Sequence, residues 1–135
     1  MRLWHFDILA FLPRSQLLAQ WRELNSVFAK EDRHVLINYI YEYDKSELLY
    51  YTEAVMAEMK SRGYKIRSFD KYERYFADTP AINMTIPFAR HHDDMYLRIC
   101  YYNLYEKFIR GQKDYTPEQF EALHRYVSTR IALHS

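Results

Sequence analysis

Residues 15–28 read SQLLAQWRELNSVF, and this stretch decides the fold that we predict. Its large apolar side chains recur three and four residues apart, as they do along one face of an amphipathic α-helix. They are Leu17, Leu18, Trp21, Leu24 and Phe28. Ser15 stands where a hydroxyl could cap the start of such a helix. The spacing therefore predicts a helix from Ser15 to Phe28, with the apolar side chains in the core.

The opposite side of this helix carries Glu23 beside Arg22. Ala19 and Ser26 stand about one turn before and after the glutamate, and both are small. A bulky ligand could therefore approach the carboxylate. Spacing alone also allows a second interpretation, in which Glu23 is a solvated carboxylate that forms ion pairs along the helix.

A second helix is expected over residues 44–63. Asp44, with Glu47 three residues later, has the spacing of a capping box. Gly63 can end the helix because glycine readily adopts the left-handed conformation found just after many helices. The predicted buried face consists of Leu48, Leu49, Thr52, Val55, Met56 and Met59.

Two more helices are expected in the C-terminal half. The first spans residues 94–109 and stops before Gly111. The second opens at Thr116-Pro117, where Gln119 completes a capping box. Together with the two earlier segments, they predict an all-α fold.

The segments between these helices have weaker patterns. Residues 34–43 alternate loosely and predict a short strand or an extended link, and residues 64–87 predict an irregular stretch. The chain has 135 residues, 49% of them hydrophobic, which is enough to bury a core within one domain. We therefore predict one compact domain of about four helices over residues 1–135.

The cellular compartment is inferred from cysteine usage and from the N-terminal residues. Cys100 is the single cysteine, which excludes an internal disulfide and suits a reducing cytosol. His5 and Asp7 interrupt the apolar N-terminal residues, which makes them a poor export signal, and no stretch approaches the length of a membrane span. We expect a cytoplasmic monomer, with Cys100 as a small core residue.

The charge is almost balanced, with 19 Lys and Arg against 18 Asp and Glu. One local basic segment could lie along phosphates, or it could be a solvated helix end and loop. It contains Lys60, Arg62, Lys65, Arg67, Lys71 and Arg74. The 14 tyrosines could stack on unpaired bases, but composition alone favours a place in the core.

The run LLAQWREL at residues 17–24, with Val27 and Phe28 after it, resembles the signature of the pyrimidine-dimer DNA glycosylase (endonuclease V) family. Further stretches resemble that family's second helix with its flanks and part of its last helix. They are His34-Val35, Tyr43-Asp44-Lys45, Lys60-Ser61-Arg62-Gly63-Tyr64 and Asn103-Leu104-Tyr105-Glu106-Lys107.

The resemblance implies an endonuclease V-like glycosylase fold and a mechanism. In that family the nucleophile is the N-terminal α-amine, and an α-amine titrates at about 7.7–8.0, so that part of it is unprotonated at neutral pH. The amine attacks C1′ of the damaged nucleotide, expels the base and leaves an imine. Proton removal at C2′ then breaks the strand by β-elimination. Glu23 corresponds to the catalytic glutamate, which stabilises the cationic intermediate and transfers protons.

The resemblance also implies the partner and its contacts. The expected substrate is double-stranded DNA with damaged pyrimidines or abasic sites, bent so that a nucleotide is flipped out of the stack. No cofactor or metal is expected. The expected DNA contacts are Arg2, Arg14, Arg22 and Lys107.

The sequence departs from the family at its N-terminus. Well-studied members have threonine after the initiator methionine, and its removal exposes the reactive amine. Here the second residue is Arg2, so we expect Met1 to remain and its amine to be the catalytic nucleophile. Ser26 and Gln16 replace an arginine and a histidine of the family, and a fourth helix replaces its aromatic and basic tail. The alternative function is therefore a non-catalytic relative that binds nucleic acid or protein on the same fold.

A third interpretation rests on His91-His92-Asp93-Asp94. A metal-dependent hydrolase at this place would need both histidines to converge on a carboxylate. Adjacent histidines on a helix rarely face one ion, and Asp93 or Asp94 is a natural N-cap for the helix that follows. We therefore expect no metal site.

Overall fold

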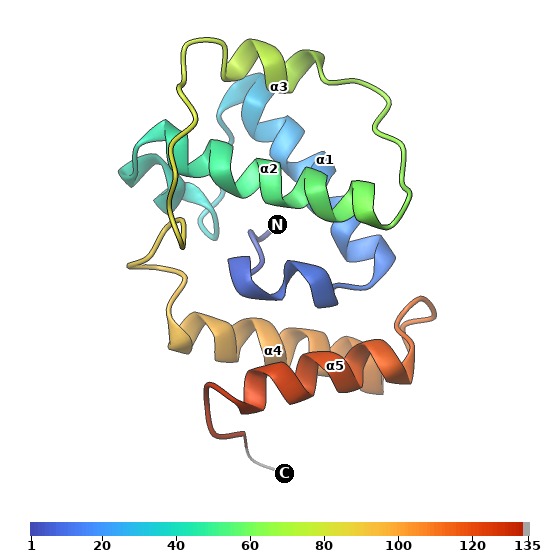
Figure 1. Cartoon of the computed structure of the whole chain (residues 1–135). Coiled ribbons are helices and arrows are strands. Elements are labelled where there is room, and N and C mark those ends of the chain that lie inside the picture. The colour runs from blue at the N-terminus through green and yellow to red at the C-terminus, as the bar shows by residue number, and fades with distance from the viewer. Residues whose placement is uncertain (134–135) are drawn as a thin grey trace.

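The chain folds into helices joined by short links, and a computed structural model describes its residues 1–133. Those residues form five α-helices and two 3-10 helices without a strand, which confirms the all-α class (Figure 1). In chain order the elements are η1 (Phe6–Phe11), α1 (Arg14–Lys30), η2 (Asn38–Glu42), α2 (Lys45–Ser61), α3 (Asp70–Tyr75), α4 (Asp94–Ile109) and α5 (Pro117–Ser128).

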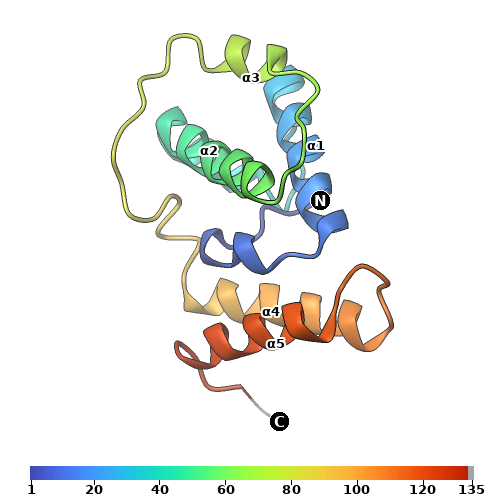
Figure 2. The same cartoon turned by 45° about the vertical axis from the view of Figure 1, so that its right-hand side comes forward.

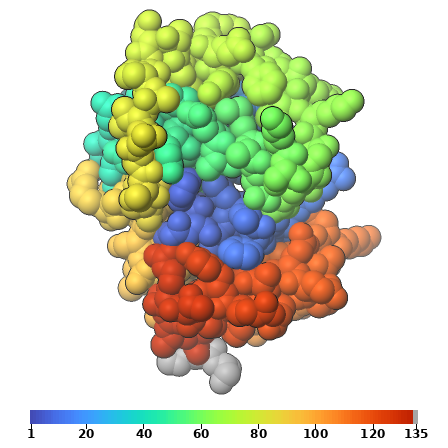
Figure 3. Space-filling view, in the orientation of Figure 1, coloured from blue at the N-terminus to red at the C-terminus, as the bar shows by residue number. Residues whose placement is uncertain are grey.

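The helices are arranged in layers. α4 and α5 lie side by side below, and α1 and α2 lie above them with α3 over α1 (Figures 1 and 2). η1 and the residues before it fill the space between these layers and contact both α2 and α5, as the space-filling view shows (Figure 3). One buried cluster draws side chains from every layer, among them Ile8, Leu24, Val55, Leu104 and Leu123. The N-terminal segment is therefore part of the core.

α1 begins one residue earlier than predicted. Pro13 holds the N-cap position, so the prediction of a Ser15 cap is wrong. Ser15 instead joins α1 to the link after α4: its N–H donates to Asp114 Oδ2 over 2.6 Å, and its Oγ accepts from Gln112 Nε2 over 2.9 Å. The buried face contains Leu17, Leu24 and Phe28 as predicted, together with Gln20 and Val27, whereas Leu18 and Trp21 are only half-buried.

α2 has the predicted ends but not the predicted capping box. Asp44 accepts from the backbone N–H of Ser46 over 2.9 Å, and Gly63 ends the helix with a φ of 80°. Glu47 is directed elsewhere, because its Oε1 accepts from the backbone N–H of Phe88 over 2.7 Å. This bond fastens the stretch before α4 to α2.

α4 and α5 agree with the predicted segments. Asp93 caps α4 by accepting from the backbone N–H of Tyr96 over 2.9 Å, and Gly111 follows the helix with a φ of 86°. Thr116 and Gln119 form the predicted capping box of α5.

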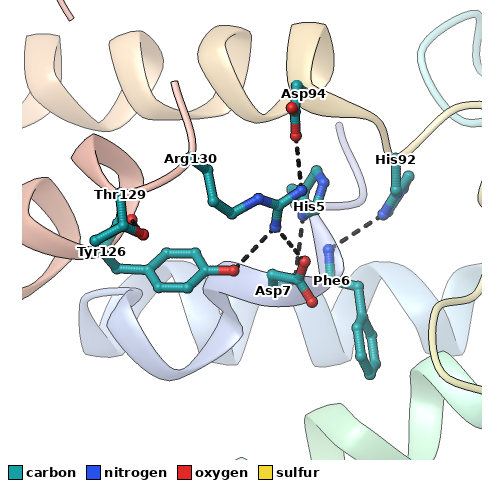
Figure 4. A network of polar contacts seen from close by, with 8 residues as sticks. All are labelled: His5, Phe6, Asp7, His92, Asp94, Tyr126, Thr129 and Arg130. Atoms are coloured by element: carbon teal, nitrogen blue, oxygen red, sulfur yellow. Dashed lines mark hydrogen bonds and ion pairs between the residues drawn. The ribbon is translucent and has the colours of Figure 1, made fainter. Parts of the chain in front are cut away.

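Three short helices lie where none was predicted. Residues 34–43 contain η2, so the predicted strand or extended link is wrong, and residues 64–87 are not irregular throughout because they contain α3. η1 was also missed; His5 Nδ1 caps it by accepting from the backbone N–H of Asp7 over 3.1 Å (Figure 4). None of the helices within residues 1–133 combines the length and the apolar character that crossing a membrane requires.

Candidate active site

The N-terminal segment, residues 1–5, is held by side chains from three helices. Tyr51 of α2 donates to the carbonyl of Trp4 over 2.6 Å, and Tyr96 of α4 donates to the carbonyl of Leu3 over 2.5 Å. His92, just before α4, accepts from the backbone N–H of Phe6 over 3.1 Å. Because all these groups are buried or half-buried, the path of the segment is fixed from its second peptide onward.

Gln20 of α1 joins this segment to Glu23. Its side chain is fully buried, and its Oε1 accepts from the backbone N–H of Trp4 over 2.8 Å and from the Tyr51 hydroxyl over 3.0 Å. Its Nε2 donates to the carbonyl of Arg2 over 3.0 Å and to Glu23 Oε2 over 3.3 Å. Both ends of the amide are therefore satisfied, as a buried polar group requires.

Glu23 is half-buried, and burial raises the pKa of its carboxyl above the ordinary value. The charge of the N-terminal amine, the backbone of Arg2 and the charge of Arg22 oppose this rise without cancelling it. A carboxyl with a raised pKa can both accept and return a proton nearer to neutral pH. This is the property that proton transfer at a reacting centre requires.

Four of the residues that the sequence analysis selected meet in one place. A hollow of about 230 Å³, which we call the Glu23 hollow, is bounded by α1, the N-terminal segment and α4. Its lining includes Met1, Arg2, Glu23 and Lys107, and the other lining residues are Trp4, Gln16, Ala19, Leu36 and Asn103. The N-terminal residue and Glu23 therefore face the same open space, with two basic side chains at its edge.

Arg14 and Arg22 lie elsewhere. They line a larger hollow of about 940 Å³, on the other flank of α1, together with part of the predicted basic segment. We call this the basic groove and define it by its cationic side chains, Arg14, Arg22, Lys65, Arg67, Lys71 and Arg74. Arg62 is not among them, because it pairs with Glu58 over 2.8 Å and donates to the carbonyl of Ala10 over 3.1 Å.

The two adjacent histidines bond to different tyrosines. His92 Nε2 lies 2.6 Å from the Tyr39 hydroxyl, whereas His91 Nδ1 lies 2.6 Å from the Tyr43 hydroxyl. Burial lowers the pKa of His92 to about 3, so that this imidazole stays neutral. Nowhere in residues 1–133 do three or more His, Cys, Asp or Glu side chains gather as metal ligands would. A metal-dependent hydrolase would need both histidines to face one carboxylate, and the two side chains bond to different tyrosines instead.

Cys100 is fully buried, as predicted, and burial raises the pKa of its thiol to about 11. A thiol with such a pKa carries almost no thiolate at neutral pH, so it is a core residue and not a nucleophile.

Gln20 and the tyrosines that hold the N-terminal segment were not predicted from the sequence. One signal was available for Gln20, since it falls within the apolar stripe between Leu17 and Leu24. A polar side chain on a buried helix face must find partners there. Nothing in the sequence indicated which backbone groups those partners would be.

The comparisons with known proteins identify the family of this chain. A family profile described as pyrimidine dimer DNA glycosylase matches residues 1–72, which include the N-terminal segment, α1 and α2. Searches of curated proteins and of solved structures gave no significant match. The profile covers more than half of the chain and contains Met1, Gln20 and Glu23. The chain therefore belongs to the pyrimidine dimer DNA glycosylase family.

Proposed function

We propose that this protein is a DNA-repair glycosylase with abasic-site lyase activity. It acts on damaged pyrimidines in double-stranded DNA through an imine formed by the amine of Met1. The observation that supports this most strongly is that Met1 and Glu23 line one open hollow, with the Glu23 carboxylate held by a bond from the buried amide of Gln20. The family match supports the class of substrate.

Apart from water, the reaction needs only groups that this chain supplies. The amine nitrogen forms a bond to C1′ while the bond from C1′ to the base breaks, and the base leaves with that electron pair and is protonated by water. The amine gives up a proton to Glu23, which returns it to O4′ as the bond from C1′ to O4′ breaks, and the opened sugar carries the protonated imine. Glu23 then takes a proton from C2′, and the electron pair of that bond expels the phosphate at the 3′ side and breaks the strand.

Glu23 suits both proton transfers. Its raised pKa favours return of the proton after it has been accepted, and its carboxylate form stabilises the positive charge on the sugar and on the imine. Arg2 and Lys107 stand at the edge of the same hollow, where they would contact the phosphates on either side of the damaged nucleotide.

The test is borohydride trapping on duplex DNA that contains an abasic site, followed by mass mapping of the crosslinked peptide. Borohydride reduces the imine to a stable amine, so a crosslink on the α-amine of Met1 is expected. We expect Glu23→Gln to lower strand cleavage by about 100-fold or more. Glu121→Gln, which changes an exposed glutamate of α5, serves as the matched control and should cleave normally.

Two outcomes would count against the proposal. A crosslink on a lysine side chain would show that another amine is the nucleophile. Intact abasic DNA and no crosslink would sink the lyase mechanism and favour the alternative, a relative that binds nucleic acid or protein without catalysis. The monomeric state and the cytoplasmic location stay predictions.

A further inference from the structure

The basic groove concentrates positive charge in a chain whose net charge is only +1. Its lining holds six cationic side chains and a single carboxylate, that of Asp70. All six cations are exposed, and none forms an ion pair with another residue of the part of the chain that the structure describes. A cluster of unneutralised cations attracts a polyanion and releases the counterions of that polyanion when it binds.

The dimensions of the groove fit a chain of phosphates better than a single anion. Its α1 wall runs from Arg14 to Asn25, which corresponds to about 16 Å at 1.5 Å per residue. One strand of B-DNA advances about 3.4 Å per nucleotide, so that length matches about five nucleotides. The charges come from three separate segments, which are α1, the link between α2 and α3, and α3 (Figure 2).

The groove and the Glu23 hollow lie on the two flanks of α1. Gln16, Ala19 and Glu23 line the hollow, whereas Arg14, Leu18, Trp21, Arg22 and Asn25 line the groove. The outer edge of α1 between the two flanks follows helical spacing. It consists of Ser15, Ala19, Arg22 and Ser26, so that three of its four side chains are small. A backbone of phosphates and sugars could therefore cross this edge closely.

We propose that the basic groove binds the phosphodiester backbone of the duplex arm beside the damaged nucleotide, so that the DNA straddles α1. The inference rests on the proposed function only for the position of that nucleotide in the Glu23 hollow. Binding of the arm itself needs no chemistry and can be measured separately.

The experiment compares two triple variants of the full chain by fluorescence anisotropy over a range of salt concentrations. The groove variant is Lys65→Gln, Arg67→Gln and Lys71→Gln. The matched control is Lys45→Gln, Arg90→Gln and Lys113→Gln, which removes three exposed cations that lie outside the groove. The DNA carries a tetrahydrofuran analogue of an abasic site, which cannot form an imine. We use a long duplex and two duplexes that are shortened on one side or the other of the analogue.

For the long duplex, the plot of log K against log salt has a negative slope, and its magnitude should be smaller by about 3 in the groove variant. Each lost phosphate contact reduces that magnitude by about 1. The affinity should fall at least about tenfold at moderate salt. The control should keep the wild-type slope. One of the two shortened duplexes lacks the arm that the groove would bind. Wild type should bind that duplex as weakly as the groove variant binds the long duplex.

An unchanged slope in the groove variant, or an equal loss in the control, would overturn the inference. So would displacement of DNA by inorganic phosphate at ionic strengths where chloride has no effect, since the groove would then hold a small anion. Borohydride trapping of wild type on a short abasic duplex separates the two proposals. If wild type is trapped but the groove variant keeps the wild-type salt slope, only the proposal for the groove is refuted. If the slope changes but wild type is not trapped, only the lyase chemistry is refuted.

Discussion

At the residue scale, the Gln20 amide bonds both to the N-terminal segment and to Glu23, and it thereby holds the two beside each other. Gln20→Leu keeps the size of the side chain but leaves the N–H of Trp4 and the carbonyl of Arg2 without partners in the core. We expect it to lower the free energy of unfolding by about 2–3 kcal/mol, measured by urea denaturation.

Gln20→Glu tests positioning apart from stability. The new carboxylate can still accept from Trp4, but it places a second negative charge beside Glu23. A like charge raises the pKa of Glu23 further, so the pH at which borohydride trapping is half-maximal should move upward. Gln119→Glu places the same new charge in the capping box of α5, outside the lining of the hollow, and its pH profile should equal that of wild type. Equal profiles for Gln20→Glu and wild type would refute a positioning role.

His92 makes the stability depend on pH. Phe6 donates to its Nδ1, so the proton of the neutral ring is on Nε2, and protonation of Nδ1 would remove the acceptor that this N–H uses. Burial lowers the folded-state pKa to about 3, whereas an unfolded histidine titrates at about 6.5, so the unfolded state takes up the proton first. The stabilisation is thus complete above about pH 6.5 and is lost at about 1 kcal/mol per pH unit as the pH falls towards 4.

Urea denaturation at a series of pH values measures this loss. His5 also has a pKa lowered by burial and contributes to the same slope, as do acidic side chains such as Asp44 whose pKa is lowered by hydrogen bonds. The comparison with His92→Asn isolates the part of the pH dependence that His92 contributes, because asparagine offers an acceptor to Phe6 but does not titrate. The slope should be shallower in this variant, and identical slopes would contradict the assignment.

At the scale of elements, Gly63 decides how α2 ends and where the wall of the basic groove begins. Its φ is 80°, and a Cβ there would meet no atom within 4 Å, so any cost of substitution is backbone strain. Gly63→Ala should lower the free energy of unfolding by about 1 kcal/mol, and Gly63→Asn by less, because asparagine tolerates this conformation better. Thermal denaturation of both variants checks the order, and equal stability of all three proteins would contradict it.

The long helices could be predicted from the sequence because their signals are local. α4 has the predicted bounds, and the Asp44 cap, Gly63 and the Thr116 capping box are each set by residues within one turn. The short helices could not be predicted in this way. η1 and α3 have six residues each, too few to show a period of 3.6, and α3 has no buried residue. η2 follows a pattern that also suits a strand.

For the candidate site too, single residues could be predicted from the sequence, whereas their positions relative to one another could not. The resemblance selected Met1 and Glu23, and Lys107 on a different helix, and the fold brings all three to one hollow. It also assigned Arg14 and Arg22 to DNA without indicating that they lie on the other flank of α1. Those relations depend on how α4 and the link after α2 pack against α1, which no local pattern determines.

At the scale of the whole molecule, α5 stands where the family resemblance leads us to expect a DNA-gripping tail. The chain just after α5 is instead tied to η1 and to α4 by Arg130, which pairs with Asp7 of η1 and, over 2.8 Å, with Asp94 at the start of α4 (Figure 4). The same guanidinium donates to the Tyr126 hydroxyl over 2.9 Å. α5 therefore closes the base of the core on which the N-terminal segment rests.

Breaking this tie should loosen the lower layer without altering the Glu23 hollow. Arg130→Met keeps most of the packing and should lower the free energy of unfolding by about 1–2 kcal/mol, since the Arg130 and Asp7 side chains are each only 27% exposed. A double-mutant cycle with Asp7→Asn should give a coupling of about 1 kcal/mol, and one with Asp94→Asn about half as much, because Asp94 is 60% exposed. Arg125→Met, which breaks an exposed pair with Glu121, should lower the free energy of unfolding by less than about 0.5 kcal/mol.

Borohydride trapping at a temperature where every variant is folded should proceed at the wild-type rate. Slower trapping by folded Arg130→Met would mean that the lower layer also holds the amine in place, and additive losses in both cycles would mean that Arg130 stabilises α5 by packing alone.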